Sequence, residues 1–352
     1  MYWYYKYPLL GILMLLLFGV GYIVWQSRSS DRTAAVAQMQ DETPDGSPPS
    51  VTPPDQIPTR VAPPVIPAAQ DVTSPPATPA PAPATPTPGG VAPRPVDPPA
   101  HVLRLLSTAR AQLAAGNLET GRELARRAMH AEGVVEFDKL WYDAAEMVSK
   151  ANTTFMNSGA PCSEKVGYTI QPGDNLTVIA YRLNTTVGAL QRMNPEMLGA
   201  TTARIYPGKT LFALRCDWSI RVVKGQYVLL LYNGPELFKL YHIAVGRENR
   251  TPLGTFDIVN KIMHPDWTHP SGKVIPYGDK ANVLGTHWMA IKPTGTTNPA
   301  LRGFGIHGTW EPDSIGTMAS LGCVRMRNDE VADLYDFIPL PGANSTTKVT
   351  IE

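Results

Sequence analysis

Residues 306–309 read Ile-His-Gly-Thr, and residues 320–326 read Ser-Leu-Gly-Cys-Val-Arg-Met. A cysteine attacks as its thiolate, so Cys323 needs a base nearby, and His307 lies sixteen positions before it. Gly322 lets the backbone approach a developing oxyanion closely. If this segment is extended, Arg325 points to the same side as Cys323 and can hold a substrate carboxylate. The two stretches therefore predict acyl transfer through a thiol.

The alternative is that Cys323 is a small buried apolar residue and His307 a core histidine. The number of matching positions argues against it, because the stretches resemble the signature of the L,D-transpeptidase catalytic domain family. That signature is His-Gly, a gap of about fifteen residues, then [Ser/Thr]-x-Gly-Cys-[Ile/Val]-[Arg/Asn]-[Met/Leu]. Residues 251–256 and the loop 264–285 resemble two further parts of the family pattern, whereas Leu321 stands where many members carry histidine.

The resemblance implies a peptidoglycan enzyme with no cofactor, in which a cysteine attacks the third residue of a donor stem tetrapeptide and expels the terminal D-Ala. The thioester then passes to the side-chain amine of an acceptor stem. Transfer to water (an L,D-carboxypeptidase), to a protein lysine or to a free D-amino acid stays open. The implied roles are nucleophile for Cys323, base for His307, a carbonyl orienting the base for Gly308, oxyanion N–H donors for Cys323 and Gly322, carboxylate binding for Arg325, and loop support for Ser320.

Residues 165–214 predict a separate β-α-α-β module. An alternating strand runs into a Pro-Gly turn, two short apolar helices follow, and a second Pro-Gly turn precedes a closing strand. The pattern resembles a LysM domain, which implies binding to the glycan strands of peptidoglycan. Its shallow groove would be lined by Gly173, Asp174, Asn175, Leu176, Ile205, Tyr206 and Pro207.

Residues 8–25 form an uncharged apolar run with aromatic residues at both ends, long enough to cross a bilayer core. We expect residues 1–30 to be an uncleaved membrane anchor. A cleaved signal peptide is the alternative, but the nearest Ala-x-Ala site, residues 35–37, lies far beyond the apolar run. The flanking charges do not settle the orientation. The expected function places the chain in the inner membrane, with its catalytic domain in the periplasm.

Between residues 31 and 100 the chain predicts a disordered linker. The part from 41 to 100 holds 20 of the 35 prolines and has no periodic apolar face. Residues 101–157 change to helical spacing and resemble a single tetratricopeptide-type helical hairpin. One such repeat cannot build a concave binding surface, so we expect a helical spacer or interaction unit.

From residue 218 to 352 the chain predicts a mainly-β, sandwich-like catalytic domain of short strands and turns, with a helix capped by Asn328 near its end. The whole is therefore a multidomain protein. Its net charge of +1 argues against a nucleic-acid partner. His264, His269 and His287 match no usual metal spacing, so no metal site is expected.

Three cysteines occur in the chain. Cys162 and Cys216 flank the LysM-like module, whose first and last strands should pair and bring its ends together. Since the periplasm is oxidising, we expect these two to form a disulfide and leave Cys323 as the free thiol.

Overall fold

The computed structural model describes residues 98–199, 204–342 and 346–352, all within one compact unit. The predicted anchor and residues 31–97 of the predicted linker lie outside these residues. None of the helices in the described ranges is long and apolar enough to span a bilayer.

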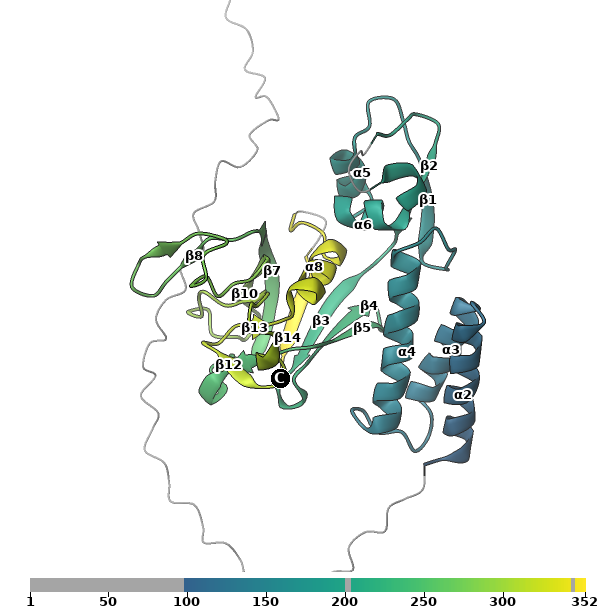
Figure 1. The fold of residues 1–352 in the computed structure, drawn as a ribbon, viewed down its shortest axis with the longest axis horizontal. Helices are drawn as coiled ribbons and strands as arrows, with labels where there is room; N and C mark the ends of the chain where they lie inside the picture. Colours follow the sequence, from purple (N-terminus) through teal and green to yellow (C-terminus); the bar gives the residue numbers. More distant parts are fainter. Residues whose placement is uncertain (1–97, 200–203, 343–345) are drawn as a thin grey trace, which may run out of the picture. The chain divides into compact units, whose positions relative to one another are not determined.

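Three helices open the described chain: α2 (Ala100–Ala114), α3 (Leu118–Met129) and α4 (Lys139–Met156) (Figure 1). The expected helical segments are thus present. Asn117 is the N-cap residue of α3, but its side chain makes no capping bond, whereas the Asp138 carboxylate caps α4 by accepting from the Trp141 N–H at 2.7 Å.

The next module contains β1 (Lys165–Thr169), α5 (Leu176–Arg182), α6 (Val187–Met193), a short α7 (Pro195–Leu198) and β2 (Thr210–Leu214). Strands β1 and β2 pair antiparallel, as the sequence predicts for a β-α-α-β module. Asn175 caps α5 by accepting from the Val178 N–H at 2.9 Å, and Thr186 caps α6 through the Ala189 N–H. Only the extra helical turn at α7 was not expected.

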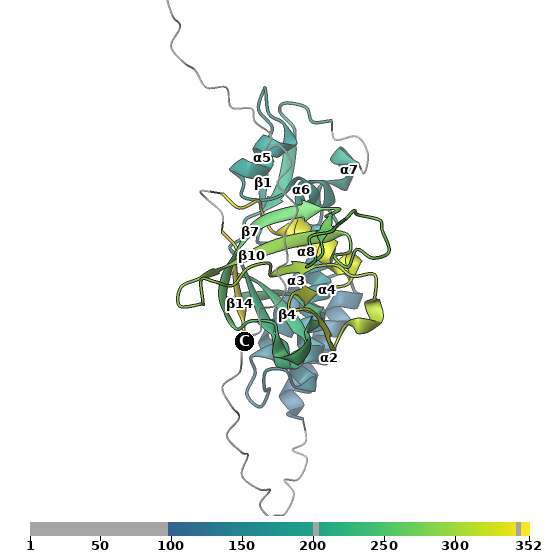
Figure 2. The ribbon, with the colours of Figure 1, turned by 90° about the vertical axis from the view of Figure 1, so that its left-hand side faces the viewer.

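The catalytic region is built on one mixed sheet of eight strands, in the spatial order β13-β11-β10-β7-β14-β3-β4-β5. Two small sheets, β12-β6 and β8-β9, lie beside it. Figure 2 shows β7 and β10 running next to each other, with the helix α8 (Asn328–Phe337) beside them. The strands are β3 (Trp218–Val223), β4 (Val228–Asn233), β5 (Glu236–His242), β6 (Val245–Gly246), β7 (Gly254–Met263), β8 (Trp267–Thr268), β9 (Val274–Ile275), β10 (His287–Thr294), β11 (Gly305–His307), β12 (Met318–Ser320), β13 (Val324–Arg325) and β14 (Lys348–Ile351).

Strand β4 is buried on both faces. Val228 and Leu230 pack against the three helices, while Leu229 and Leu231 point into the main core of the sheet. Its unbroken apolar run therefore has a partner on each side, as in strands covered on both faces. The helical unit is thus part of the packed body, and its role as a spacer or interaction unit stays a prediction.

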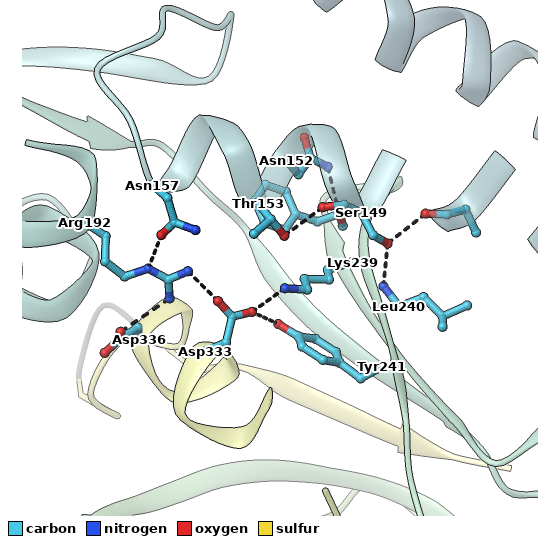
Figure 3. A network of polar contacts seen from close by, with 12 residues as sticks. Ser149, Asn152, Thr153, Asn157, Arg192, Lys239, Leu240, Tyr241, Asp333 and Asp336 are labelled. Atoms are coloured by element: carbon cyan, nitrogen blue, oxygen red, sulfur yellow. Dashed lines mark hydrogen bonds and ion pairs between the residues drawn. The ribbon is translucent and has the colours of Figure 1, made fainter. Parts of the chain in front are cut away.

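A polar network joins α6 of the LysM-like module to α8 (Figure 3). The Asp333 carboxylate accepts from Lys239 Nζ at 2.7 Å, from Tyr241 Oη at 2.8 Å and from the Arg192 guanidinium. Arg192 also donates to Asn157 Oδ1 at 2.8 Å. The two cations hold the pKa of the Asp333 carboxyl below its usual value although burial opposes them. The network therefore keeps Asp333 ionised and also holds α6 against α8.

Strand β4 begins at Val228, because Tyr227 takes a left-handed conformation, with φ of 53°, after a turn of 3₁₀ helix (Lys224–Gln226). One local prediction was wrong. Asn328 is the first residue of α8 and not its cap. The cap position is held by Arg327, which makes no side-chain capping bond.

Candidate active site

Two short strands bring the predicted catalytic residues together at one edge of the sheet. Strand β11 pairs in parallel with the edge strand β13, with His307 opposite Arg325. The Met326 N–H also donates to the His307 carbonyl at 2.8 Å. Cys323 lies in the bend directly before β13, in one buried cluster with Trp288, whose ring stacks on that of His307. Base, nucleophile and cation therefore lie close together at this edge.

The His307 ring is held in a defined orientation. Its Nδ1 lies 2.6 Å from the Gly308 carbonyl oxygen, which can only accept, so Nδ1 carries the proton and Nε2 is left as the basic atom. Burial, and then the Arg325 charge, lower the pKa of His307 to about 4. His307 is therefore a neutral imidazole at neutral pH, which is the form a general base requires.

The Cys323 side chain is 6 % exposed, and burial raises the pKa of its thiol to about 11. Its Sγ donates to the Gly303 carbonyl, with 3.7 Å between the two atoms. A backbone hydrogen bond from Gly305 lowers the pKa of the thiol against the effect of burial, and among the described residues His307 makes no hydrogen bond to Sγ. Catalytic contacts in an empty site commonly tighten only when substrate binds. The resting pair is thus a thiol beside a neutral imidazole.

The loop before the nucleophile is tied by Ser320. Its Oγ donates to the Cys323 carbonyl at 2.7 Å and accepts from the Gly322 N–H at 3.1 Å. Gly322 has a φ of 139°, and a Cβ there would lie 2.8 Å from the Phe304 ring, so only glycine fits. The expected support by Ser320 is present. The Gly322 N–H is already bonded, however, so it is not free to donate to an oxyanion.

Arg325 is buried but not fully paired. Its Nη1 lies 2.9 Å from Glu311 Oε2 and 3.3 Å from Ser314 Oγ, while its Nε is buried without a partner. The Arg325 charge lowers the pKa of both His307 and Cys323. The guanidinium thus lies within electrostatic reach of the reacting pair, and its buried Nε–H is left without a partner.

An apolar cover lies over the nucleophile. Trp267 and Ile275 of the β8-β9 hairpin form one buried cluster with Leu284, Trp288 and Cys323. Trp288 is the register partner of His307 on β10, and their rings stack with centroids 5.8 Å apart. The loop 264–285 thus contributes side chains that cover the nucleophile. Sequence reasoning did not single out Trp288, because burial does not alternate in this part of β10 and no periodic pattern marks one face.

The sequence analysis also did not identify the contact that Asn328 makes in the structure. Its Oδ1 accepts from the Thr286 N–H at 3.1 Å, and a Cβ on Gly308 would collide with that oxygen. Asn328 therefore fixes the backbone behind the carbonyl that orients His307. Its sequence position suggested a helix cap, which hid this contact.

The three histidines considered for a metal have separate surroundings. His264 stacks on Tyr277, His269 Nδ1 lies 2.8 Å from Ser271 Oγ, and His287 Nδ1 lies 2.9 Å from Thr286 Oγ1. Within the described ranges, no three His, Cys, Asp or Glu side chains gather as metal ligands would.

The predicted glycan groove is assembled from two turns. Ile170 donates to the Lys209 carbonyl and accepts from the Gly208 N–H, so the turns at 171–176 and 205–209 lie side by side. Tyr206 is 58 % exposed between them. The remaining groove residues differ in role: Gly173 has a φ of 86°, the Asp174 carboxylate accepts from Tyr168 Oη and the Gln171 N–H, Asn175 caps α5, Leu176 is buried, Ile205 is half-buried and Pro207 is exposed.

Cys162 and Cys216 are free thiols in this structure, in contrast to the expected disulfide. The last contact between the two chain ends is from the Arg215 N–H to the Glu164 carbonyl, at 3.0 Å. Cys216 follows this contact by one residue and Cys162 precedes it by two, so they are not direct partners across the ladder. They are nevertheless close enough for the charge of Cys162 to affect the pKa of Cys216.

A buried thiol, an oriented neutral imidazole and an adjacent guanidinium under an apolar cover define a cysteine acyltransferase site. The model of the L,D-transpeptidase catalytic domain (YkuD) matches residues 217–351, and that of the LysM domain matches residues 168–213. A putative L,D-transpeptidase YkuD of Bacillus licheniformis is 32 % identical over 181 residues, which are 49 % of this chain and 93 % of that relative. Its counterpart in Bacillus subtilis is 30 % identical over 188 residues, 52 % of this chain and 97 % of that relative.

The chain belongs to the L,D-transpeptidase family, and its catalytic domain is preceded by a LysM domain. The family assignment made from residues 306–326 is therefore confirmed. The enzyme is a peptidoglycan L,D-transpeptidase.

Proposed function

We propose that Cys323 and His307 carry the transfer through a thioester. His307 Nε2 takes the thiol proton as the sulfur attacks the carbonyl carbon of the third residue of a donor stem. The tetrahedral intermediate collapses, the terminal D-Ala leaves as an amine with the proton from the imidazolium, and a Cys323 thioester remains. The amine of an acceptor stem then attacks the thioester, gives its proton to His307 and releases the thiol. The parallel pairing of β11 with β13, which brings His307 beside the segment that begins with Cys323, carries this proposal.

Other residues around the pair stabilise the charges that develop. With the Gly322 N–H bonded to Ser320, the Cys323 N–H is the remaining oxyanion donor of the two expected. The partly unpaired guanidinium of Arg325 supports binding of a donor carboxylate. The apolar cover of Trp267 and Trp288 favours transfer to an amine over hydrolysis, because it excludes water from the thioester.

The test is to incubate the chain without residues 1–97 with disaccharide-tetrapeptide and weigh the products. We expect cross-linked dimer and a thioester adduct on the protein. Cys323→Ala should abolish both, and His307→Ala should slow acylation by about 10² to 10⁴. Release of D-Ala without dimer would identify an L,D-carboxypeptidase. Transpeptidation above a few per cent in Cys323→Ala would remove Cys323 as the nucleophile.

We further propose that the LysM groove holds glycan strands and keeps the enzyme on the cell wall. The exposed Tyr206 beside the first turn supports this role. Tyr206→Ala should weaken sedimentation with insoluble peptidoglycan and leave turnover of soluble stem peptides unchanged. Tyr181→Ala on α5 is the control, since this tyrosine is 69 % exposed and lies outside the two turns. Equal sedimentation of Tyr206→Ala and the unaltered chain would contradict the groove.

The cellular location follows from the substrate and the sequence. Peptidoglycan lies outside the cytoplasmic membrane, and residues 8–25 are long and apolar enough for a single anchor. We infer a protein held in the inner membrane, with the catalytic domain in the periplasm. Alkaline extraction of membranes and protease accessibility in spheroplasts test both parts; recovery in the soluble fraction would indicate a cleaved signal peptide.

A further inference from the structure

Three aromatic side chains form a row on the surface of the catalytic domain. The His264 and Tyr277 rings stack with centroids 4.2 Å apart, and the Trp310 ring follows with its centroid 6.2 Å from that of Tyr277. His264 is exposed, Tyr277 is half-buried and Trp310 is 48 % exposed. The mechanism above uses none of the three.

The aromatic row lies next to the reacting residues. Trp310 follows His307 by three residues, so their Cα atoms are at most about 10 Å apart. The next residue, Glu311, bonds to Arg325, which brings this segment back to β13 two residues from Cys323. His264 and Tyr277 belong to the loop whose β8-β9 hairpin covers Cys323. The aromatic row therefore borders the active site.

The row is also held in place by the backbone. His264 has a φ of 53°, a conformation that costs of order 1 kcal/mol for a residue with a side chain, and its N–H donates to the Thr286 carbonyl at 2.8 Å. The Tyr277 N–H donates to Asp266 Oδ1 at 3.0 Å. A strained residue that supports an exposed ring is typical of a binding surface, since packing alone would have favoured a relaxed, covered ring.

The chemistry of the row fits a sugar ring. Aromatic faces carry partial negative charge, and a pyranose presents apolar C–H groups with partial positive charge on one face. Anionic lipid is a poorer match, because Glu311 and Asp313 follow Trp310 and both are exposed acids. The substrate itself supplies a saccharide: the stem begins on an amino sugar, and three extended residues separate that sugar from the attacked carbonyl by about 10 Å. This span is long enough to cover the at most about 10 Å between the Cα atoms of His307 and Trp310.

We propose that His264, Tyr277 and Trp310 form a saccharide subsite that holds the amino sugar bearing the donor stem. The inference rests on the proposed function, because it places the attacked carbonyl at Cys323. The subsite is separate from the LysM groove. It explains how the enzyme can favour a stem still attached to glycan over a free peptide.

The experiment compares two donors, disaccharide-tetrapeptide and the same tetrapeptide without sugar, with an excess of one acceptor. Trp310→Ala and Tyr277→Ala in the chain of residues 98–352 should raise KM for the disaccharide donor about tenfold and leave KM for the free tetrapeptide nearly unchanged. Trp310→Phe should recover most of the preference. Leu340→Ala, which truncates a 67 % exposed side chain after α8, is the control.

Equal changes for both donors, or no change for either, would overturn the subsite. A second assay separates it from the catalytic proposal: calorimetric binding of disaccharide-tetrapeptide and of free tetrapeptide to Cys323→Ala, with and without Trp310→Ala. Loss of the difference between the two ligands in the double variant supports the subsite, and its persistence refutes it. A wild-type chain that is acylated by neither donor would overturn the proposed mechanism while the binding result still decides the subsite.

Discussion

His307 and Cys323 start the reaction as an uncharged pair, because burial moves their pKa values in opposite directions. The pKa of the His307 imidazole is lowered to about 4, and the pKa of the Cys323 thiol is raised to about 11. In the empty site the proton therefore stays on sulfur. The charge has to separate when substrate is bound, where the Arg325 guanidinium and the oxyanion donor can stabilise it.

Acylation should accordingly be nearly independent of pH between about 5.5 and 8.5. His307 is active when neutral, and a pKa of about 4 keeps it neutral throughout this range. The rate should fall only below about pH 5. Single-turnover acylation followed by intact mass gives the profile. An inflection near 6.5 would show that the imidazole is not buried in the working enzyme.

The same shift makes folding sensitive to acid. In the unfolded chain a histidine has a pKa near 6.5. Between about pH 6.5 and pH 4 the unfolded state therefore binds a proton that folded His307 does not bind. Stability present above pH 6.5 is therefore lost as the pH falls toward 4. Urea unfolding at pH 7 and pH 4.5 should differ by about 2 kcal/mol more in the unaltered chain than in His307→Asn. If the change in unfolding free energy between the two pH values were the same in both proteins, His307 would not have a lowered pKa in the folded state.

The contact between Arg325 and Glu311 predicts a competition with substrate. Glu311 is 75 % exposed, and such a partly exposed pair is worth about 0–1 kcal/mol, so a donor carboxylate can displace it. Glu311→Gln should lower KM for the donor up to about fivefold with little change in kcat. Steady-state kinetics at low salt measure this, with Asp313→Asn as control. A raised KM would mean that Glu311 positions Arg325 for substrate.

At the scale of the elements, α8 makes contacts both at the active site and with the LysM domain. Its first residue, Asn328, holds the Thr286 N–H behind Gly308, and its Asp333 joins the network with Arg192 and Lys239 (Figure 3). A single helix thus fixes both the backbone that orients the base and the contact with the LysM domain.

Removing the Asn328 amide should therefore affect the base as well as stability. Asn328→Ala leaves the part-buried Thr286 N–H without its acceptor, which should lower the free energy of unfolding by about 1–3 kcal/mol. A positioning role further predicts a lower kcat at unchanged KM, and Asn328→Asp should restore most of both. Chemical denaturation and steady-state kinetics decide it. A loss of stability with kcat unchanged would reduce Asn328 to a structural residue.

The contrast between Cys323 and Asn328 shows how far the sequence alone could lead. The nucleophile, base and cation fall in short stretches whose spacing already implies the chemistry, and the β-α-α-β order of the LysM domain follows from local turns and caps. Asn328 makes its contact with Thr286 across 42 positions, which no local pattern reveals. The double burial of β4 was hidden for the same reason, since an apolar run does not say which element covers each face.

At the scale of the whole molecule, the two cysteines beside the LysM domain make a prediction about the compartment. Both thiols are free here, and burial raises the pKa of Cys162 and of Cys216. Protein secreted into an oxidising compartment should still join them, with a small shift of the chain beyond the Arg215 contact. Closing a loop of about 54 residues would stabilise the domain by roughly 4 kcal/mol in the chain-entropy model.

Counting thiols in unfolded, non-reduced protein from the periplasm tests this bond. One reactive thiol, on Cys323, is expected, and three would show that no bridge forms. The double variant Cys162→Ser, Cys216→Ser should then match the reduced wild type in stability. Comparing oxidised with reduced wild type gives the effect of the disulfide on stability. Comparing reduced wild type with the double variant gives the effect of the side-chain substitutions.

The covering of β4 by the helices sets an order of events during synthesis. Asn152 of α4 donates to the Phe238 carbonyl of β5 from 86 positions earlier in the chain. The helices therefore emerge first, with the face that will meet β4 and β5 still open to water. At about 5–20 residues per second, the strands that close it follow roughly 4 to 17 seconds later. For that interval the nascent chain exposes an apolar surface, and a chaperone that shields residues 100–156 would act in this window.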